Sequence, residues 1–276
     1  MPDNLVGKVA VVTGGSSGIG LASAEAFVAE GARVVIGDIQ DERGRAAVER
    51  LGDAAHYLHV DVRDDEQVGA LVDAAVERFG RIDVMFNNAA AAGDTSPITE
   101  LGPEGLDASL RVIVGSAVSG HRYAARAFAA QGGGGSIITT SSGAGLQGGW
   151  ASAGYVIGKH AVIGLVRHAA AELGPLGIRS NAICPGITMT PVMAIGIARD
   201  RKPAFLDELG IALRDEQPIK RVGQPDDIAA AAVFLASDMS RFVNGVALPV
   251  DGGASAVTLG RFDEISAEVR AAFGGR

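Results

Sequence analysis

The sequence is poor in cysteine and in positive charge, and it contains no long apolar run. Its single cysteine, Cys184, cannot form a disulfide within the chain, which is typical of a protein from a reducing cytoplasm. The formal net charge of −8 disfavours nucleic acid as a partner, because such binding draws on clustered lysine and arginine. No apolar run approaches the roughly 20 residues of a membrane helix, and the first residues do not resemble a secretory signal. We therefore expect a cytoplasmic protein with neither a nucleic-acid nor a membrane partner.

Metal-binding patterns are missing as well. The five histidines show neither an HExxH motif nor a cysteine and histidine spacing suited to a metal, so we predict no metal site. The rest of the composition is typical of a folded protein, with 47% hydrophobic and 20% charged residues. The length of 276 residues permits one large domain or two small ones.

Short runs rich in valine and isoleucine alternate with alanine-rich stretches whose apolar residues recur at helical spacing. This alternation is typical of βαβ units around a parallel sheet. It predicts a single α/β domain over residues 1–253, with a doubly wound sheet (a Rossmann fold) and ligands at the carboxyl ends of its strands. The seven predicted strands are 8–13, 33–38, 56–60, 82–87, 136–141, 178–184 and 246–250.

Three segments stand apart from this pattern. The four glycines at 132–135 are either a hinge or a surface turn, and their place between a helix and a strand favours the turn. Residues 191–217 lack strand character and are long for a connection, so we expect a substrate lid there. Residues 254–276 form a tail in which 262–273 are expected to be a short amphipathic helix docked on folded protein.

A glycine-rich loop, TGGSSGIG, follows the first strand and opens the first helix. Gly14, Gly18 and Gly20 would let the backbone turn tightly, approach a pyrophosphate and pack the helix on the sheet. The second strand ends at Asp38, where a carboxylate can bind the adenosine ribose hydroxyls and would repel a 2′-phosphate. Because no basic residue lies in the loop, the sequence favours NAD over NADP. The alternative for Asp38 is a cap on the following helix.

Tyr155 and Lys159 lie four residues apart in the segment YVIGK, on one face of the helix predicted over 153–173. A free tyrosine, with a pKa of about 10, is a poor base near neutral pH. A nearby ammonium group would stabilise the phenolate and make it a usable base. The spacing alone is common in helices, so the neighbouring motifs decide whether this pair is catalytic.

Further motifs follow along the chain: DV at 61–62, NNAA at 87–90, SS at 141–142, PG at 185–186 and VDGG at 250–253. With the glycine-rich loop, Asp38 and YVIGK, they resemble the short-chain dehydrogenase/reductase family in its single-domain form, over residues 5–253. The resemblance implies that Tyr155 is the catalytic acid or base, and that Lys159 lowers its pKa and holds the nicotinamide ribose. It also implies that Ser142 binds the substrate oxygen, whereas the adjacent strand residue Ser141 should face away.

The same resemblance implies a set of cofactor contacts along the carboxyl edge of the sheet. Asp61 and Val62 would lie at the adenine, and the main chain of Thr188 and the hydroxyl of Thr190 would lie at the nicotinamide carboxamide. The family also implies a homodimer or homotetramer packed through its long helices. The expected cofactor-binding residues are Gly14, Ser16, Ser17, Gly18, Ile19, Gly20, Asp38, Ile39, Asp61, Val62, Asn88, Ala89, Ala90, Tyr155, Lys159, Pro185, Gly186, Thr188 and Thr190.

The sequence departs from the family pattern at two positions. Ala90 stands where the family has glycine, which narrows the pocket entrance by a methyl group. Ile113 aligns with the fourth catalytic residue of the family, an asparagine, and isoleucine cannot form a side-chain hydrogen bond. A proton relay through a water behind Lys159 would then depend on a main-chain carbonyl.

We expect a largely apolar substrate without phosphate, because apolar residues dominate the expected pocket walls. Trp150 lies between Ser142 and Tyr155 in the sequence, and it either lines this pocket or packs at a subunit contact. The expected substrate-binding residues are Ala144, Leu146, Trp150, Ile187 and Met193.

The predicted function is the transfer of a hydride between NAD and a secondary alcohol or ketone, with an apolar or alicyclic substrate. Reduction of an imine and oxidation of a cis-dihydrodiol remain alternatives, because neither needs different residues. A dinucleotide-sensing binding protein without turnover is a further alternative, supported by Ile113 alone. The presence of Ser142, Tyr155 and Lys159 argues against it, because a pure sensor needs no base beside the nicotinamide.

Overall fold

The computed structural model describes residues 3–194 and 197–257. A seven-stranded parallel sheet, in the order β3-β2-β1-β4-β5-β6-β7, forms its centre. The doubly wound α/β fold expected from the sequence is confirmed, and each strand lies within two residues of its predicted bounds. The strands are β1 Val9–Thr13, β2 Arg33–Asp38, β3 Ala55–His59, β4 Val84–Asn87, β5 Gly135–Thr140, β6 Ile178–Pro185 and β7 Ala247–Val250.

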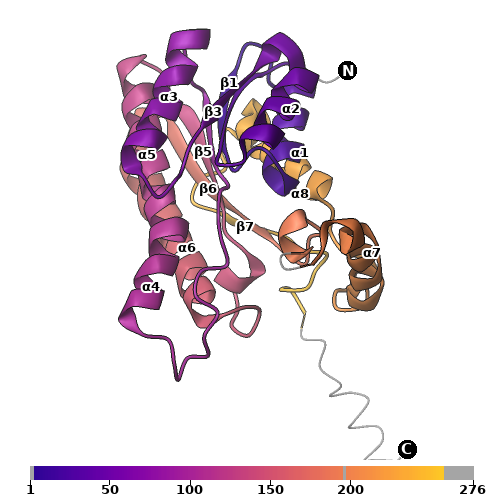
Figure 1. Ribbon diagram of the computed structural model, residues 1–276. Helices are drawn as coiled ribbons and strands as arrows, with labels where there is room; N and C mark the ends of the chain where they lie inside the picture. Colours follow the sequence, from indigo (N-terminus) through magenta and orange to yellow (C-terminus); the bar gives the residue numbers. More distant parts are fainter. Residues whose placement is uncertain (1–2, 195–196, 258–276) are drawn as a thin grey trace, which may run out of the picture.

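Helices cover both faces of the sheet (Figure 1). One layer contains α1, α2 and α8, and the other contains α3, α4, α5 and α6. Helix α7, in the segment predicted to be a lid, lies apart from both layers. The helices are α1 Gly18–Ala29, α2 Asp41–Leu51, α3 Asp65–Phe79, α4 Pro103–Leu110, α5 Ser116–Ala130, α6 Ala153–Leu173, α7 Lys202–Leu213 and α8 Pro225–Ala236.

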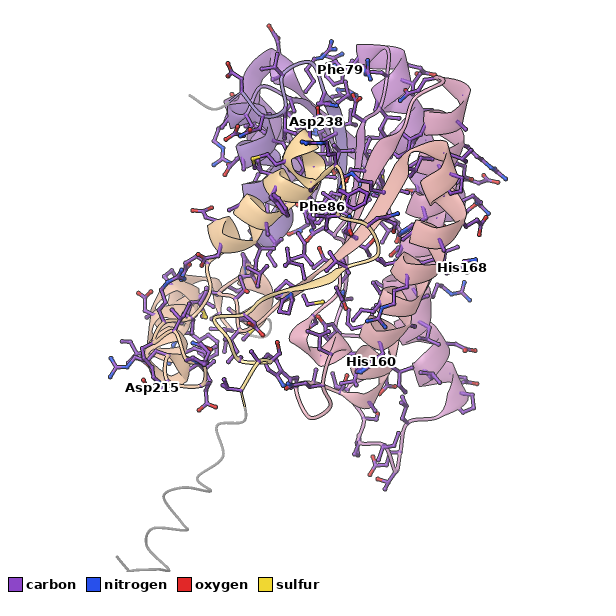
Figure 2. All side chains as sticks on the ribbon, turned by 180° about the vertical axis from the view of Figure 1, so that it is seen from behind. Phe79, Phe86, His160, His168, Asp215 and Asp238 are labelled. Atoms are coloured by element: carbon purple, nitrogen blue, oxygen red, sulfur yellow. The ribbon has the colours of Figure 1, made fainter. Side chains whose placement is uncertain are left out.

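Each face of the sheet has its own apolar core. Along β1, Ala10 and Val12 pack with Phe27 of α1, whereas Val9 and Val11 pack in the cluster on the other face. Alternate residues of a strand point to opposite faces, so a strand buried on both faces is apolar throughout, as VAVVT of β1 is. Phe86 is buried in the core, whereas Asp215, after α7, is exposed (Figure 2).

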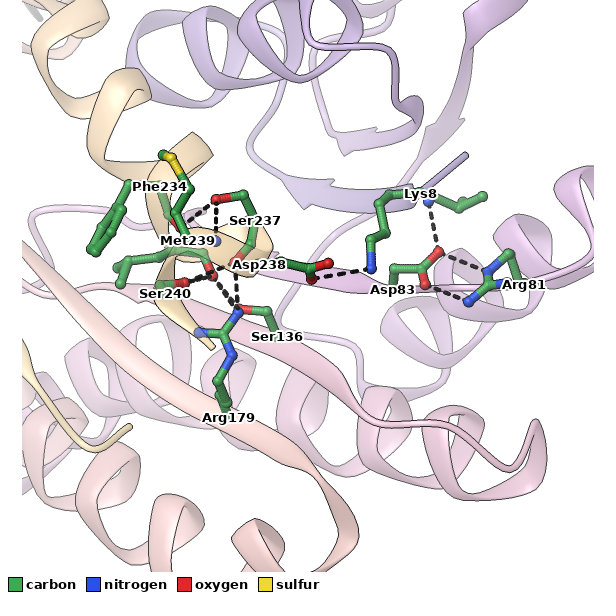
Figure 3. Close-up of polar contacts among 12 residues, drawn as sticks. Lys8, Arg81, Asp83, Ser136, Arg179, Phe234, Ser237, Asp238, Met239 and Ser240 are labelled. Atoms are coloured by element: carbon green, nitrogen blue, oxygen red, sulfur yellow. Dashed lines mark hydrogen bonds and ion pairs between the residues drawn. The ribbon is translucent and has the colours of Figure 1, made fainter. Parts of the chain in front are cut away.

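The amino ends of the strands are fastened by charged side chains (Figure 3). Asp83 accepts hydrogen bonds from the amide of Val9, at 2.9 Å, and from the guanidinium of Arg81. Arg179 donates to the carbonyl oxygens of Leu235, at 2.8 Å, and Ser237, at 3.4 Å. Cations suit these carbonyls because the end of a helix carries partial negative charge. Charge at this edge therefore serves the fold, whereas the predicted site residues lie towards the opposite edge.

The structure describes two of the three segments that stand apart in the sequence. Gly132 has a positive φ of 72° in a turn between α5 and β5, which confirms the predicted turn. The predicted lid, 191–217, contains short 3-10 turns and α7 but no strand among its described residues. Thr188, before this segment, and Gly223, after it, form an isolated parallel bridge. The helix expected at 262–273 lies outside the described residues. Within the described part of the chain, no helix has the length and apolarity to cross a membrane.

Candidate active site

The order of the strands in the sheet determines where a ligand can bind. From β1 the chain winds outward through β2 to β3, then returns to add β4 on the other side of β1. Loops that follow β1 and β4 therefore diverge at the carboxyl edge and leave a crevice, where open α/β sheets bind their ligands. Most of the residues predicted to bind cofactor or substrate lie in the loops after β1, β4, β5 and β6 or on the first turns of the helices that follow β1 and β5, and four others lie at or just after the ends of β2 and β3.

The glycine-rich loop has the geometry of a pyrophosphate site. Gly14 and Gly18 have positive φ values of 65° and 53°, and a Cβ on Gly20 would lie 2.1 Å from the carbonyl oxygen of Gly14. Ser17, the residue before α1, makes no side-chain hydrogen bond to the helix, and the first turn holds no acidic residue. The amide groups that begin α1 can therefore bind an anion, as a dinucleotide requires.

Asp38 lies at the end of β2 with only 6% of its surface exposed. Its Oδ2 accepts a hydrogen bond from the amide of Ser16 at 3.1 Å, and its Oδ1 accepts one from the amide of Gln40 at 3.0 Å. Gln40 immediately precedes α2, so Asp38 joins the glycine-rich loop to the start of that helix. The predicted contact of Asp38 with a ribose stays a prediction. Arg43, which the sequence argument did not include, donates to Gln40 Oε1 at 2.9 Å.

Two threonines that the sequence argument missed hold the NNAA segment. The Thr13 hydroxyl accepts hydrogen bonds from the amides of Asn88, at 3.0 Å, and Ala89, at 3.1 Å. The Thr140 hydroxyl donates to Asn88 Oδ1 at 3.1 Å. Because Thr13 ends β1 and Thr140 ends β5, the only available signal was their place at strand ends. At the predicted adenine position, Arg63 binds Asp61 and lowers the pKa of its carboxyl group.

Helix α6 begins and ends at the predicted residues and carries both Tyr155 and Lys159. Lys159 is 2% exposed, and its ammonium lies 2.7 Å from the carbonyl oxygen of Thr140 and 5.5 Å from the centroid of the Tyr155 ring. Ser142 lies near the Tyr155 hydroxyl and favours its ionised form. The structure thus brings the three predicted catalytic side chains together at the end of β5.

Burial shifts the pKa of both ionisable groups in this cluster. It lowers the pKa of Lys159 to about 8, because the ammonium is taken out of water. Burial also raises the pKa of Tyr155, and the nearby Ser142 opposes that rise. The lowering of the Tyr155 pKa by Lys159, implied by the family resemblance, stays a prediction. The ammonium of Lys159 is directed at the Thr140 carbonyl oxygen.

Ser141 and Ser142 have different surroundings. Ser141 is buried and donates a hydrogen bond to the carbonyl oxygen of Lys159 at 2.9 Å. Ser142 is partly exposed, and its hydroxyl accepts a hydrogen bond from the amide of Ala144 at 3.1 Å. Ser141 therefore fastens α6 to the strand end, while Ser142 remains beside Tyr155.

Ile113 lies within a π-helical turn, Arg111–Gly115, between α4 and α5. It is 3% exposed and packs with Ala117 and Val162. Its Cγ2 lies 3.1 Å from the place that a Cβ on Gly158 would occupy, so the two residues fit each other closely. Because Gly158 directly precedes Lys159, the backbone before Lys159 lies against the apolar side chain of Ile113.

The predicted substrate-binding residues are spread over three degrees of burial. Ala144 is buried, and Leu146 is partly buried against the cluster that contains Ile163. Met193 is 38% exposed on the short turn Pro191–Ala194. Ile187 and Trp150 are partly exposed, and the indole ring of Trp150 lies against Gly143. Among the described residues, no group of three or more histidine, cysteine, aspartate or glutamate side chains is arranged to hold a metal.

Comparison with known proteins identifies the family. A family model described as Enoyl-(Acyl carrier protein) reductase matches residues 14–255, and curated dehydrogenases and reductases align over nine-tenths of the chain. The chain belongs to the short-chain dehydrogenase/reductase family. It is therefore an oxidoreductase of the short-chain type, a class that uses nicotinamide cofactors.

Three relatives show how far the similarity of this short-chain oxidoreductase extends. Momilactone A synthase of Oryza sativa subsp. japonica is 44% identical over 257 residues, which is 92% of each chain. The 2,5-dichloro-2,5-cyclohexadiene-1,4-diol dehydrogenase of Sphingobium indicum is 41% identical, over 92% of this chain and 99% of its own. The (+)-borneol dehydrogenase 1 of Salvia officinalis is 39% identical, over 92% of this chain and 95% of its own.

Proposed function

We propose that this protein catalyses the reversible NAD-dependent oxidation of a secondary alcohol to a ketone, with an apolar or alicyclic substrate. The observation that carries the proposal is the cluster of Ser142, Tyr155 and Lys159 at the end of β5. This cluster lies at the carboxyl edge of the sheet, as does the start of α1, whose amides can bind an anion.

The bound nicotinamide would accept or supply the hydride. Ser142 would hold the substrate oxygen in place, and the Tyr155 hydroxyl would exchange a proton with that oxygen. Because burial raises the pKa of Tyr155, the phenolate needs a nearby positive charge, which Lys159 would supply from beside the ring. Thr140 holds that charge in the site by accepting a hydrogen bond through its carbonyl oxygen.

NAD is favoured over NADP by the position of Asp38. Its carboxylate is hydrogen-bonded to the amide of Ser16 in the glycine-rich loop. A carboxylate there can accept hydrogen bonds from ribose hydroxyls and repels a 2′-phosphate. Arg43 lies two hydrogen bonds away, through Gln40, and is the nearest candidate for a phosphate contact if Asp38 is removed.

An alicyclic substrate is favoured by the apolar pocket residues and by two relatives. The names of these relatives specify borneol, a bicyclic alcohol, and a cyclohexadiene diol. The second name favours a second candidate function, dehydrogenation of a cyclic diol, which needs the same catalytic residues. In both functions, we propose that Trp150 would lie beside the ring of the substrate.

We also propose that the protein forms a homodimer or homotetramer in the cytoplasm. Val118 on α5 and Ile157 on α6 are 43% and 41% exposed, and these neighbouring helices could bury them against a second copy. Cys184 is a free thiol and is buried, as expected in a reducing compartment.

The deciding experiment is a screen of secondary alcohols, cyclic diols and ketones, followed by NADH absorbance. We expect turnover with at least one alicyclic alcohol or ketone, and a higher kcat/KM with NAD than with NADP. Turnover confined to sugar phosphates or coenzyme A esters would contradict the substrate class, and a preference for NADP would contradict the cofactor.

A further inference from the structure

The loop that follows Ser142 carries the only tryptophan of the chain, Trp150. A Cβ on Gly143 would lie 2.7 Å from Cζ3 of the indole ring and 3.1 Å from Cη2. The ring therefore packs on the backbone of Gly143, the residue after Ser142, and any side chain at position 143 would displace it. The indole lies beside the residue expected to hold the substrate oxygen.

Gln147 holds this indole in place from the other side. Its Oε1 accepts a hydrogen bond from Trp150 Nε1 at 3.3 Å. Its Nε2 donates a hydrogen bond to the carbonyl oxygen of Ser255 at 3.1 Å. The side-chain amide of Gln147 therefore links Trp150, in the loop after Ser142, to Ser255, which lies 108 residues further along the chain than Gln147.

The Ser255 end of this connection is itself fixed to the sheet. Asp251, the residue after β7, accepts hydrogen bonds from the amides of Gly253, at 2.9 Å, and Ser255, at 2.8 Å. A Cβ on Gly186 would lie 2.7 Å from the Cβ of Asp251, so the turn also packs against the loop after β6. A continuous set of contacts therefore runs from β7 through Asp251, Ser255 and Gln147 to Trp150.

We propose that Gln147 is a positioning residue that fixes Trp150 as a flat wall beside Ser142, and that this wall selects ring-shaped substrates over linear ones. The selection rests on the proposed function, whereas the fixing of the ring does not. An indole offers a large rigid apolar face, and its N–H needs a partner when it is partly buried. The hydrogen bond to Gln147 would hold the ring against Gly143, where its flat face would complement a ring of the substrate better than a flexible chain.

The first test uses the intrinsic fluorescence of the protein without added ligand, because Trp150 is the only tryptophan. Gln147→Met keeps the length of the side chain and removes both hydrogen bonds. Gln147→Glu keeps an acceptor for the indole but loses the donor to Ser255. We expect greater quenching by acrylamide and a red-shifted emission maximum for Gln147→Met, with an intermediate effect for Gln147→Glu. The Trp150→Phe variant contains no tryptophan and gives the background emission.

Gln131→Met is the matched control. Gln131 also makes two hydrogen bonds with its amide, to the main-chain nitrogen and oxygen of Ile82, but at the amino edge of the sheet. Its substitution should leave the emission of Trp150 unchanged. If Gln147→Met has wild-type quenching and emission, Gln147 does not fix the ring and the proposal is wrong. Emission that changes when the protein is diluted through dissociation of an oligomer would also overturn it, by placing Trp150 at a subunit contact.

The second test compares cyclohexanol with 2-hexanol as substrates. For Gln147→Met we expect the KM for cyclohexanol to rise about tenfold and that for 2-hexanol by less than about threefold, with kcat for both within about threefold of wild type. An equal loss of kcat with both alcohols would indicate structural damage and contradict selection by the wall. If wild type oxidises neither alcohol, the best cyclic and the best linear alcohol of the screen replace them. A screen without a cyclic substrate overturns the selection along with the proposed substrate class, whereas the fluorescence result still decides the role of Gln147.

Discussion

The ammonium group of Lys159 lies 2.7 Å from the carbonyl oxygen of Thr140, the last residue of β5. Ser141, the next residue, donates its hydroxyl to the carbonyl oxygen of Lys159. The catalytic helix and the end of the strand are therefore joined at both the side chain and the backbone of one residue. This double attachment holds a buried lysine, with its pKa lowered to about 8, beside the Tyr155 ring.

Tyr155→Phe should nearly abolish turnover while the protein stays folded. The substitution removes the hydroxyl that we propose exchanges a proton with the substrate, and general acid or base catalysis contributes on the order of a hundred- to ten-thousand-fold in rate. The measurement is kcat with the best substrate of the screen. Tyr123→Phe is the control, because it removes a hydroxyl that binds Asp65 between α3 and α5. A Tyr155 variant with the wild-type rate would overturn the mechanism.

Asp38→Ala should narrow the preference for NAD over NADP. The variant loses the carboxylate that would repel a 2′-phosphate, and it leaves Arg43 nearby through Gln40. The ratio of kcat/KM for the two cofactors measures the effect. Asp53→Ala, an exposed aspartate on the turn before β3, should leave that ratio unchanged. An unchanged ratio in the Asp38 variant would show that another residue selects the cofactor.

Ile113→Asn should change kcat by less than about tenfold in either direction, which corresponds to roughly 1.4 kcal/mol in the barrier. In the proposed mechanism Tyr155 exchanges the proton with the substrate, whereas the side chain at position 113 packs against Gly158. The new amide also enters an apolar cluster with Ala117 and Val162. Ile113→Val, which keeps the cluster apolar, is the control. An inactive wild type that gains turnover through asparagine would instead favour the sensor function.

Acidification should destabilise the fold through His121. Burial lowers the pKa of His121 to about 4, from 6.5, while its ring nitrogens bond to Ala117 and Ser180. Between these two values the unfolded chain takes up a proton that the folded protein does not. Stability is therefore complete above pH 6.5 and falls as the pH decreases towards 4, by about 2 kcal/mol at pH 5.

Urea unfolding at pH 7 and pH 5 measures this loss. His121→Asn should lose less free energy of unfolding than wild type between the two pH values. His168→Asn is the control, because His168 is 76% exposed on α6 and should leave the pH dependence as it is. Equal pH dependence in wild type and His121→Asn would show that another group causes the acid sensitivity.

Much of this protein follows from its sequence. The strands were predictable because runs buried on both faces of a parallel sheet must be apolar and are bounded by polar or glycine-rich turns. Helix α6 was predictable at both ends because its residues keep helical spacing from Ala153 to Leu173. Ser142, Tyr155 and Lys159 could be grouped because the spacing of their motifs fits the family, and the structure brings them together.

Tertiary structure alone decided which groups these residues touch. Thr140 became the partner of Lys159, and Gln147 joined Trp150 to Ser255, because the sheet order brings β5, β6 and β7 side by side. No local periodicity encodes such contacts, because their partners are separated by up to 108 residues. The sequence determines where strands and helices form through local patterns of burial. The pairing of their loops depends on how the whole sheet packs, and it sets the surroundings of each catalytic group.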